Sequence, residues 1–135
     1  MIYLLDTCVL SEATKARQNP SVISWLSSHE LERQYVSAVT IGELHYGVER
    51  MSDGRRRNGL RAWLKEVQQD YHGRIVPLDL AVAEQWGRLR AASPNAQTVD
   101  AQLAATALAY DFTFVTRNVG HFQFEGLRVF NPWQT

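Results

Sequence analysis

The stretch IYLLDTCVL at residues 2–10 begins with four apolar residues that run directly into Asp6. A short apolar run without alternation is typical of a strand buried on both faces of a parallel sheet. Asp6 is therefore predicted to lie at the carboxyl end of the first strand. A carboxylate in this position has two interpretations: it caps the helix that follows, or it is one ligand of a site to which other segments contribute.

Short strands and helices alternate along the rest of the chain. Further strands are predicted at 35–37, 74–79, 112–116 and 127–130. Helices are predicted from Asn19-Pro20, from near Thr40, over 53–71, around 82–89 and over 98–110. This alternation predicts a single α/β domain spanning 1–135, with a central parallel sheet of four to five short strands and helices on both faces.

The composition is compatible with one soluble domain. The chain has 135 residues, of which 45% are hydrophobic, enough for one sizeable core. The 14 basic and 14 acidic residues cancel, so net charge says little about partners. No apolar run approaches the roughly 18 residues of a membrane span, and the start does not resemble a signal peptide. We therefore expect a cytoplasmic protein in which the single cysteine, Cys8, is a packed thiol.

Polar residues fall where several predicted elements meet one edge of the sheet. Binding sites of open α/β sheets form beyond the carboxyl ends of the strands. Asp6 follows the first strand, and the segment 116–118 follows the strand at 112–116. Glu43 is predicted in the first turn of the helix after the second strand, and Asp100 in the first turn of the helix at 98–110. These positions are therefore expected to converge.

Each position also has a purely structural interpretation. Thr40 and Glu43 match the capping-box pattern, in which the glutamate reaches back to the start of its helix. Asp100 in a first turn interacts favourably with the helix dipole, with Thr98 available as the cap. The remaining candidates are cap or turn residues in this interpretation: Asp6, Asp79 and Asn118.

A cluster of carboxylates indicates a divalent cation. Acidic groups crowded at one edge repel each other, and their pKa values rise unless a cation neutralises them. Oxygen ligands suit the hard ions Mg²⁺ and Mn²⁺, and no Cys/His spacing indicates zinc. Such a site can activate a water molecule and stabilise charge on a phosphodiester.

Four blocks of the sequence, in order, resemble one known family. They are LLDTCVLSE at 4–12, SAVTIGELHYGVER at 37–50, VDAQLAATALAYDFTFVTRNVGHF at 99–122 and VFNPW at 129–133. Together they resemble PIN-domain ribonucleases, in particular the VapC and FitB-like toxins of bacterial type II toxin–antitoxin pairs. The resemblance covers nearly the whole chain.

The resemblance implies a compact PIN-like fold and RNA cleavage that depends on Mg²⁺ or Mn²⁺. It also implies a homodimer held inactive by a small antitoxin that binds DNA. The acids of the family's metal site fall on Asp6, Glu43 and Asp100, and Asn118 is implied as a catalytic polar neighbour or water-mediated ligand. Five further positions are implied to support the site or contact substrate: Thr7, Ser37, Thr116, Arg117 and His121.

His121 departs from the family pattern. Many relatives carry an acid just before the phenylalanine of the third block, where this chain has His121 and then Phe122. With three carboxylates a second metal site would be weaker, or would form only when RNA phosphate adds oxygens. His121 is either a proton donor or phosphate contact, or an exposed residue at the end of a turn.

The expected mechanism is metal-assisted attack of water on an RNA phosphodiester, in a loop of tRNA or ribosomal RNA where bases are accessible. Arg117 and the cluster at 55–61 are candidate phosphate contacts, although the cluster also suits a solvated, antitoxin or dimer surface. Two alternatives stay open. A haloacid-dehalogenase-like phosphatase also starts from a strand-end Asp but needs a second Asp where Cys8 stands. A PIN-fold binding module without catalysis is the other.

Overall fold

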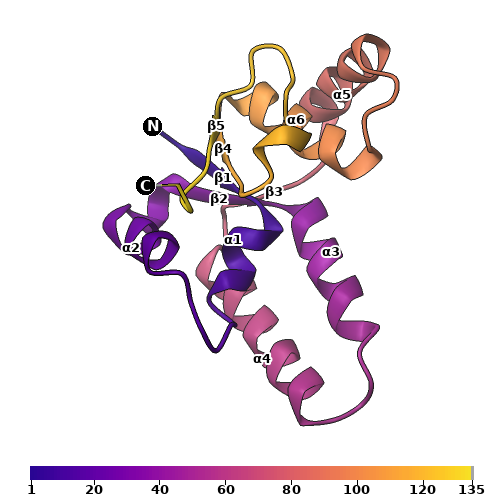
Figure 1. Cartoon of the computed structure of the whole chain (residues 1–135). Coiled ribbons are helices and arrows are strands. Elements are labelled where there is room, and N and C mark those ends of the chain that lie inside the picture. Colours follow the sequence, from indigo (N-terminus) through magenta and orange to yellow (C-terminus); the bar gives the residue numbers. More distant parts are fainter. Residues whose placement is uncertain (135) are drawn as a thin grey trace.

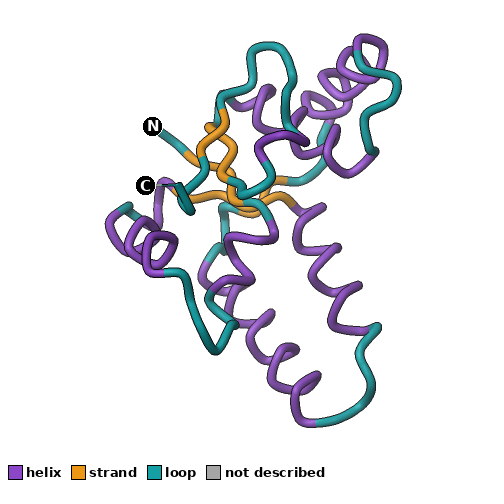
Figure 2. The backbone as a smooth tube through the Cα atoms, viewed as in Figure 1, coloured by secondary structure: helices purple, strands orange, loops and turns teal. Residues whose placement is uncertain are grey.

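A five-stranded parallel sheet forms the centre of the protein, whose computed structural model describes residues 1–134 (Figures 1 and 2). The strand order is β3-β2-β1-β4-β5. The strands are β1 Tyr3–Leu5, β2 Gln34–Ser37, β3 Ile75–Val76, β4 Thr113–Val115 and β5 Val129–Phe130. The helices are α1 Thr7–Glu12, α2 Pro20–Ser28, α3 Ala38–Glu49, α4 Arg55–Asp70, α5 Leu80–Ala92 and α6 Thr98–Tyr110, with short 3₁₀ turns η1 Leu31–Arg33 and η2 Val119–His121. The predicted α/β class and parallel sheet are confirmed.

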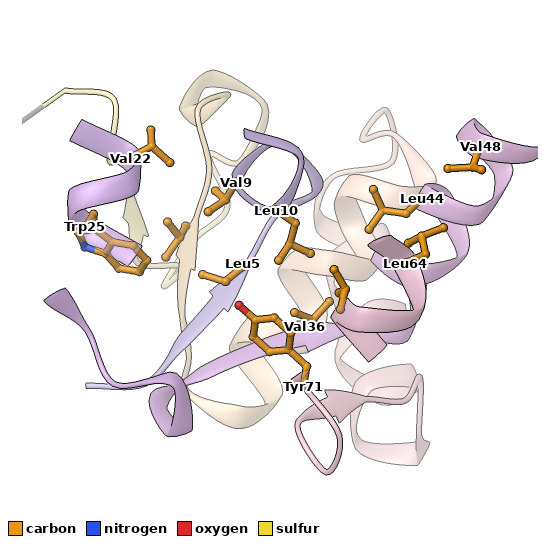
Figure 3. Close-up of a cluster of buried hydrophobic side chains, with 12 residues drawn as sticks. Leu5, Val9, Leu10, Val22, Trp25, Val36, Leu44, Val48, Leu64 and Tyr71 are labelled. Carbon is orange, nitrogen blue, oxygen red and sulfur yellow. The ribbon is translucent and has the colours of Figure 1, made fainter. Parts of the chain in front are cut away.

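Adjacent residues of the central strands serve two separate cores. Leu5 packs in the core that α1–α4 cover, whereas Leu4 packs in the core under α5 and α6. Val115 and Phe114 divide in the same way on β4. Figure 1 shows these two helical layers on opposite sides of the sheet, and Figure 3 shows the first core. Both faces of each central strand are therefore buried, which explains their unbroken apolar runs.

Side-chain caps set the starts of two helices as predicted. The Asn19 side chain accepts hydrogen bonds from the N–H groups of Ser21 and Val22, with Pro20 at the first helical position. Asp79 accepts from the Val82 N–H at 3.0 Å and so caps α5. Both residues therefore have the structural roles that the sequence indicated.

The capping box that was the structural alternative for Thr40 and Glu43 is not formed. Helix α3 begins two residues earlier, because Ser37 is the cap and accepts a hydrogen bond from the Val39 N–H at 3.0 Å. Strand β2 runs directly into the helix, which leaves no linker for a later start. Glu43 consequently lies in the second turn of α3, not the first. Thr40 is fully buried, and its hydroxyl has no hydrogen-bond partner among residues 1–134.

One further predicted boundary is shifted. The strand expected at 74–79 is confined to β3, because Pro77 has no N–H to donate and Asp79 already caps α5. Helix α6 spans Thr98–Tyr110 as predicted, but Gln97 rather than Thr98 is in the cap position. Its buried alanines allow close packing, and α5 lies against it. None of the helices described between residues 1 and 134 has the length and apolarity needed to cross a membrane.

Candidate carboxylate-lined site

A pocket of about 630 Å³ opens at the carboxyl edge of the sheet. The start of α1, the second turn of α3, the first turn of α6 and the segment after β4 all contribute to its wall. Six of the nine predicted site residues line it: Asp6, Thr7, Glu43, Asp100, Asn118 and His121. The convergence expected from the sequence is therefore present.

Asp6 is held rigidly at the base of the pocket. Its Oδ1 accepts a hydrogen bond from the Thr7 N–H at 2.8 Å, which caps α1. Its Oδ2 accepts from the Thr116 hydroxyl at 2.7 Å, and the carboxylate is only 8% exposed. The two interpretations of Asp6 are thus compatible, because one side chain caps a helix and also faces the pocket.

Thr116 supports the site from behind. It is fully buried, and its N–H donates to the Phe130 carbonyl at 3.0 Å, which ties it to β5. While its hydroxyl donates to Asp6, the same oxygen accepts the Asn118 N–H at 3.1 Å. One side chain therefore fixes the carboxylate on β1 and the position of Asn118 after β4.

Asp100 and His121 form a second part of the wall. His121 Nδ1 lies 3.9 Å from Asp100 Oδ2, with side-chain exposures of 68% and 19% respectively. Burial raises the pKa of Asp100; the positive charge of His121 opposes this rise and the Asp6 carboxylate adds to it. The site therefore contains a desolvated carboxyl group that a nearby cation would stabilise in its charged form.

Glu43 is the least constrained of the three acids. It is exposed on α3, and no hydrogen bond or ion pair involves it among the residues that the structure describes. Across residues 1–134, no three or more Asp, Glu, His or Cys side chains lie close enough to hold a metal ion together. The three acids therefore line one pocket but do not converge on a single position where they could all coordinate one ion.

The donor chemistry of the pocket fits a hard divalent cation. Asp6, Glu43 and Asp100 offer carboxylate oxygens, which Mg²⁺ and Mn²⁺ prefer. Burial is the main cause of the raised pKa of Asp100, and the Asp6 carboxylate adds to it, so a cation bound nearby would favour the charged form. Because Glu43 is exposed, its side chain is free to move toward the other two.

Three predicted site residues lie outside the pocket wall. Ser37 is buried as the cap of α3, and Thr116 lies behind Asp6. Arg117 is exposed, with its guanidinium 5.4 Å from the centre of the Trp133 ring. Of these three, only Thr116 contacts a pocket carboxylate.

The pocket also has walls that the sequence interpretation did not include. Cys8 lines it, with its thiol 3.7 Å from Asp6 Oδ2. Burial and the adjacent Asp6 charge raise the pKa of the Cys8 thiol, so it stays protonated at neutral pH. Leu103 and Phe122 supply apolar surface. Leu103 follows Asp100 by three residues on one helix, a spacing that could have revealed it.

The arginine cluster at 55–61 has a structural role in part. Arg57 and Arg61 both donate to Glu49 Oε1, at 3.0 and 2.7 Å, and Arg61 Nε also donates to Oε2 at 2.8 Å, which joins α3 to α4. The hydrogen bonds from Arg61 and Arg57 lower the pKa of Glu49 to about 2. Half of the cluster is therefore engaged within the protein.

An α/β domain with a parallel sheet in this order, and with acids from the end of β1, from α3 and from α6 around one pocket, is the architecture of the PIN domain. The sequence model of the PIN domain family matches residues 3–126, and the chain belongs to that family. Membership excludes the haloacid-dehalogenase-like alternative.

Relatives are similar over nearly their whole length. The chain is 39% identical to the plasmid stability protein StbB of Pseudomonas syringae pv. tomato, over 97% of this chain and 98% of the relative. It is 35% identical to the VapC ribonuclease Y4jK of Sinorhizobium fredii, covering 97% of each. The crystal structure of FitAcB from Neisseria gonorrhoeae contains a chain that superposes with a TM-score of 0.93 at 35% identity, covering 99% of this chain and 100% of that one.

Proposed function

We propose that the protein is a metal-dependent endoribonuclease that acts as the toxin of a type II toxin–antitoxin pair. The observation that carries the proposal is the gathering of Asp6, Glu43 and Asp100 around one pocket in a PIN-family chain. Its relatives include proteins named VapC ribonuclease and toxin FitB, each similar over almost its full length.

Asp6, Glu43 and Asp100 would hold Mg²⁺ or Mn²⁺, with Asn118 as a further oxygen donor at the rim. When bound, the ion would supply Lewis-acid activation of water and neutralisation of phosphate charge. The protein's part is to fix its ligands. Thr116 and the Thr7 N–H hold the two oxygens of Asp6, so this carboxylate needs no reorganisation.

The substrate would be RNA with unpaired bases, as in a tRNA or ribosomal RNA loop. Bases in a loop can leave the stack and enter a pocket, whereas the A-form duplex hides its base edges. The pocket combines acids with apolar wall from Leu103 and Phe122, which suits a base beside a scissile phosphate.

The proposed partner is a small DNA-binding antitoxin encoded beside the toxin. FitAB, a relative of known structure at 33% identity and a TM-score of 0.91, was solved bound to a DNA fragment. We propose that this chain likewise forms a homodimer that its antitoxin inhibits.

The decisive experiment is RNA cleavage by purified protein freed of its antitoxin. We expect cleavage with Mg²⁺ or Mn²⁺ and none with EDTA. Asp6→Asn and Asp100→Asn should each reduce the rate by at least ~100-fold. Asp79→Asn is the matched control, because Asp79 also follows a strand and caps a helix but lies outside the pocket.

Cleavage that survives EDTA, or an equal loss of rate in Asp79→Asn, would contradict the proposal. The alternative is a PIN-fold binding module without catalysis, which the separation of the three acids in the described residues supports. Calorimetric titration with Mn²⁺ separates the two. The nuclease should bind Mn²⁺ and lose this binding in Asp6→Asn, whereas an inert module should show no binding heat.

A further inference from the structure

The turn Asn131-Pro132-Trp133 follows β5, and none of its residues lines the pocket. The Asn131 side chain accepts the Trp133 N–H at 2.9 Å, which fixes the turn. Strand β5 leads into it, and the Phe130 carbonyl accepts the Thr116 N–H. Trp133 packs against the core that α1–α4 cover, and Figure 1 shows the tail returning to that side of the sheet. The tail is therefore fixed relative to Thr116.

Arg117 connects this turn to the site. Its guanidinium lies 5.4 Å from the centre of the Trp133 ring, within the range of a cation–π interaction. In the chain it stands between Thr116, which holds Asp6, and Asn118, which lines the pocket. Arg117 itself does not line the pocket. Its side chain therefore packs on an aromatic ring, while the residues on either side of it in the chain hold and line the site.

The hydrogen-bond donors of Arg117 are open to solvent. Within residues 1–134, no carboxylate oxygen lies within 4.0 Å of its guanidinium, whereas Arg57, Arg61 and Arg128 each bind one. A guanidinium that an aromatic ring orients, and that no carboxylate occupies, is pre-organised to bind an external anion. Arg also suits phosphate because its planar fork matches two phosphate oxygens.

Glu12, a buried acid at the end of α1, does not compete for Arg117. It is 2% exposed, and its oxygens bind the Asn19 N–H at 2.7 Å and the Lys15 ammonium at 3.1 Å. The hydrogen bond from the Asn19 N–H is the main cause of its lowered pKa; Lys15 contributes less, and the charge of Arg117 contributes least. The charge of Arg117 thus acts on Glu12, while the guanidinium N–H groups of Arg117 form no ion pair with it.

We infer that Arg117, oriented by Trp133, binds an RNA phosphate outside the catalytic pocket, at a nucleotide flanking the cleaved bond. Trp133 is a positioning residue that acts through Arg117. This inference rests on the proposed ribonuclease function and adds a phosphate subsite to it. The contact is expected to be independent of base identity, because phosphates carry no sequence information.

RNA binding without cleavage tests the subsite. All variants are made in the Asp6→Asn background without divalent metal, and the probe is a fluorescein-labelled single strand of about 12 nucleotides of mixed sequence. Anisotropy measured between about 50 and 200 mM salt gives affinity and salt slope. Arg117→Ala should weaken binding about tenfold at low salt and reduce the slope by about 0.7. Arg33→Ala should change neither the affinity nor the salt slope, because Arg33 precedes β2 and so lies at the amino ends of the strands, away from the pocket at their carboxyl ends.

A double-mutant cycle tests the positioning role of Trp133. Trp133→Leu should weaken binding by about two- to fivefold, and Trp133→Phe, which keeps an aromatic face, should restore most of it. In the Arg117→Ala background, Trp133→Leu should have no further effect. Trp63→Leu is the packing control, since Trp63 is partly buried against the same core. It should lower thermal stability without changing RNA affinity.

Three results would overturn the inference. In the first, Arg117→Ala leaves the RNA affinity and the salt slope unchanged. In the second, Trp133→Leu still weakens RNA binding in the Arg117→Ala background. In the third, the parent Asp6→Asn protein binds no RNA at about 50 mM salt. If the Arg117 and Trp133 variants bind the antitoxin more weakly but bind RNA normally, the two residues would instead be assigned to the antitoxin interface. A wild-type protein that cleaves RNA while Arg117→Ala binds normally refutes only the subsite. The absence of Mn²⁺-dependent cleavage refutes the proposed function.

Discussion

Replacing Thr116 by valine should destabilise the protein and impair the site at once. The two side chains have nearly the same shape, so packing in the fully buried position changes little. The substitution removes the hydroxyl that donates to Asp6 Oδ2 at 2.7 Å. It also removes the acceptor of the Asn118 N–H, but Asn118 is exposed and water can replace that bond. The main cost is therefore a charged oxygen left almost buried with one strong donor fewer.

The magnitude follows from the burial of Asp6. Leaving a buried charged acceptor without its partner costs about 2–3 kcal/mol. A chain of this length has an unfolding entropy of about 0.28 kcal/mol/K near its melting temperature, so Tm should fall by roughly 7–11 °C. The thiol of Cys8, 3.7 Å from the same oxygen, is too weak a donor to compensate.

Thermal and urea unfolding of metal-free protein at pH 7 measure this effect. Thr116→Ser is the matched control, because it keeps the hydroxyl and loses only a methyl group. Thr116→Ser should retain most of the RNA cleavage, whereas Thr116→Val should lose it in proportion to the displacement of Asp6. If Thr116→Val unfolds at the same temperature as Thr116→Ser, the hydrogen bond from Thr116 to Asp6 does not stabilise the folded protein.

Four further variants are predicted together. Asp100→Asn should stabilise metal-free protein at pH 7 by about 0.5 kcal/mol, because burial raises the pKa of Asp100 and so disfavours its charged form. This gain should vanish as the pH falls below the ordinary pKa of Asp, and thermal melts across a pH series measure it. Glu43→Gln should leave apo stability unchanged but abolish stabilisation by excess Mn²⁺ in thermal melts. Glu49→Gln should lower Tm at pH 7, and the difference should close as pH falls from 4.5 to about 2, because the pKa of Glu49 is lowered to about 2. Leu64→Ala, in the core and 1% exposed, should cost about 2–5 kcal/mol in urea unfolding, whereas Leu80→Ala, 76% exposed, should cost less than ~0.5 kcal/mol.

The strand signals were strong because both faces of the central strands are buried. Leu4 and Leu5 serve different cores, and an unbroken apolar run is the only pattern that satisfies both. Caps with a single candidate, such as Asn19, were also predictable. The start of α3 was not, because Ser37 and Thr40 are both good cap residues. Which one caps depends on where β2 stops pairing with its neighbours, a tertiary property.

The acids of the candidate site could be predicted from the sequence, but the residues that hold them in place could not. Parallel topology places the residues after β1 and β4 at the same edge of the sheet, so Asp6 and Asn118 could be expected to converge; the pairing of β1 with β4, which brings them together, was not predicted. The hydrogen bond from Thr116 to Asp6 spans 110 positions and depends on one buried rotamer. The direction of the Arg117 side chain depends likewise on Trp133, which joins the site only through the pairing of β4 with β5.

The three acids differ in how firmly the fold holds them, and this difference suggests how the site would use a cation. Asp6 is fixed by two hydrogen bonds, and Asp100 is desolvated on the first turn of a long helix. Glu43 is exposed and has no hydrogen bond or ion pair within residues 1–134. Ordering such a side chain costs on the order of 1–2 kcal/mol, which a cation that draws it toward the other acids must offset. The net contribution of Glu43 to metal affinity should therefore be reduced by this ordering cost, whereas Asp6, already held by two hydrogen bonds, contributes its oxygens without it.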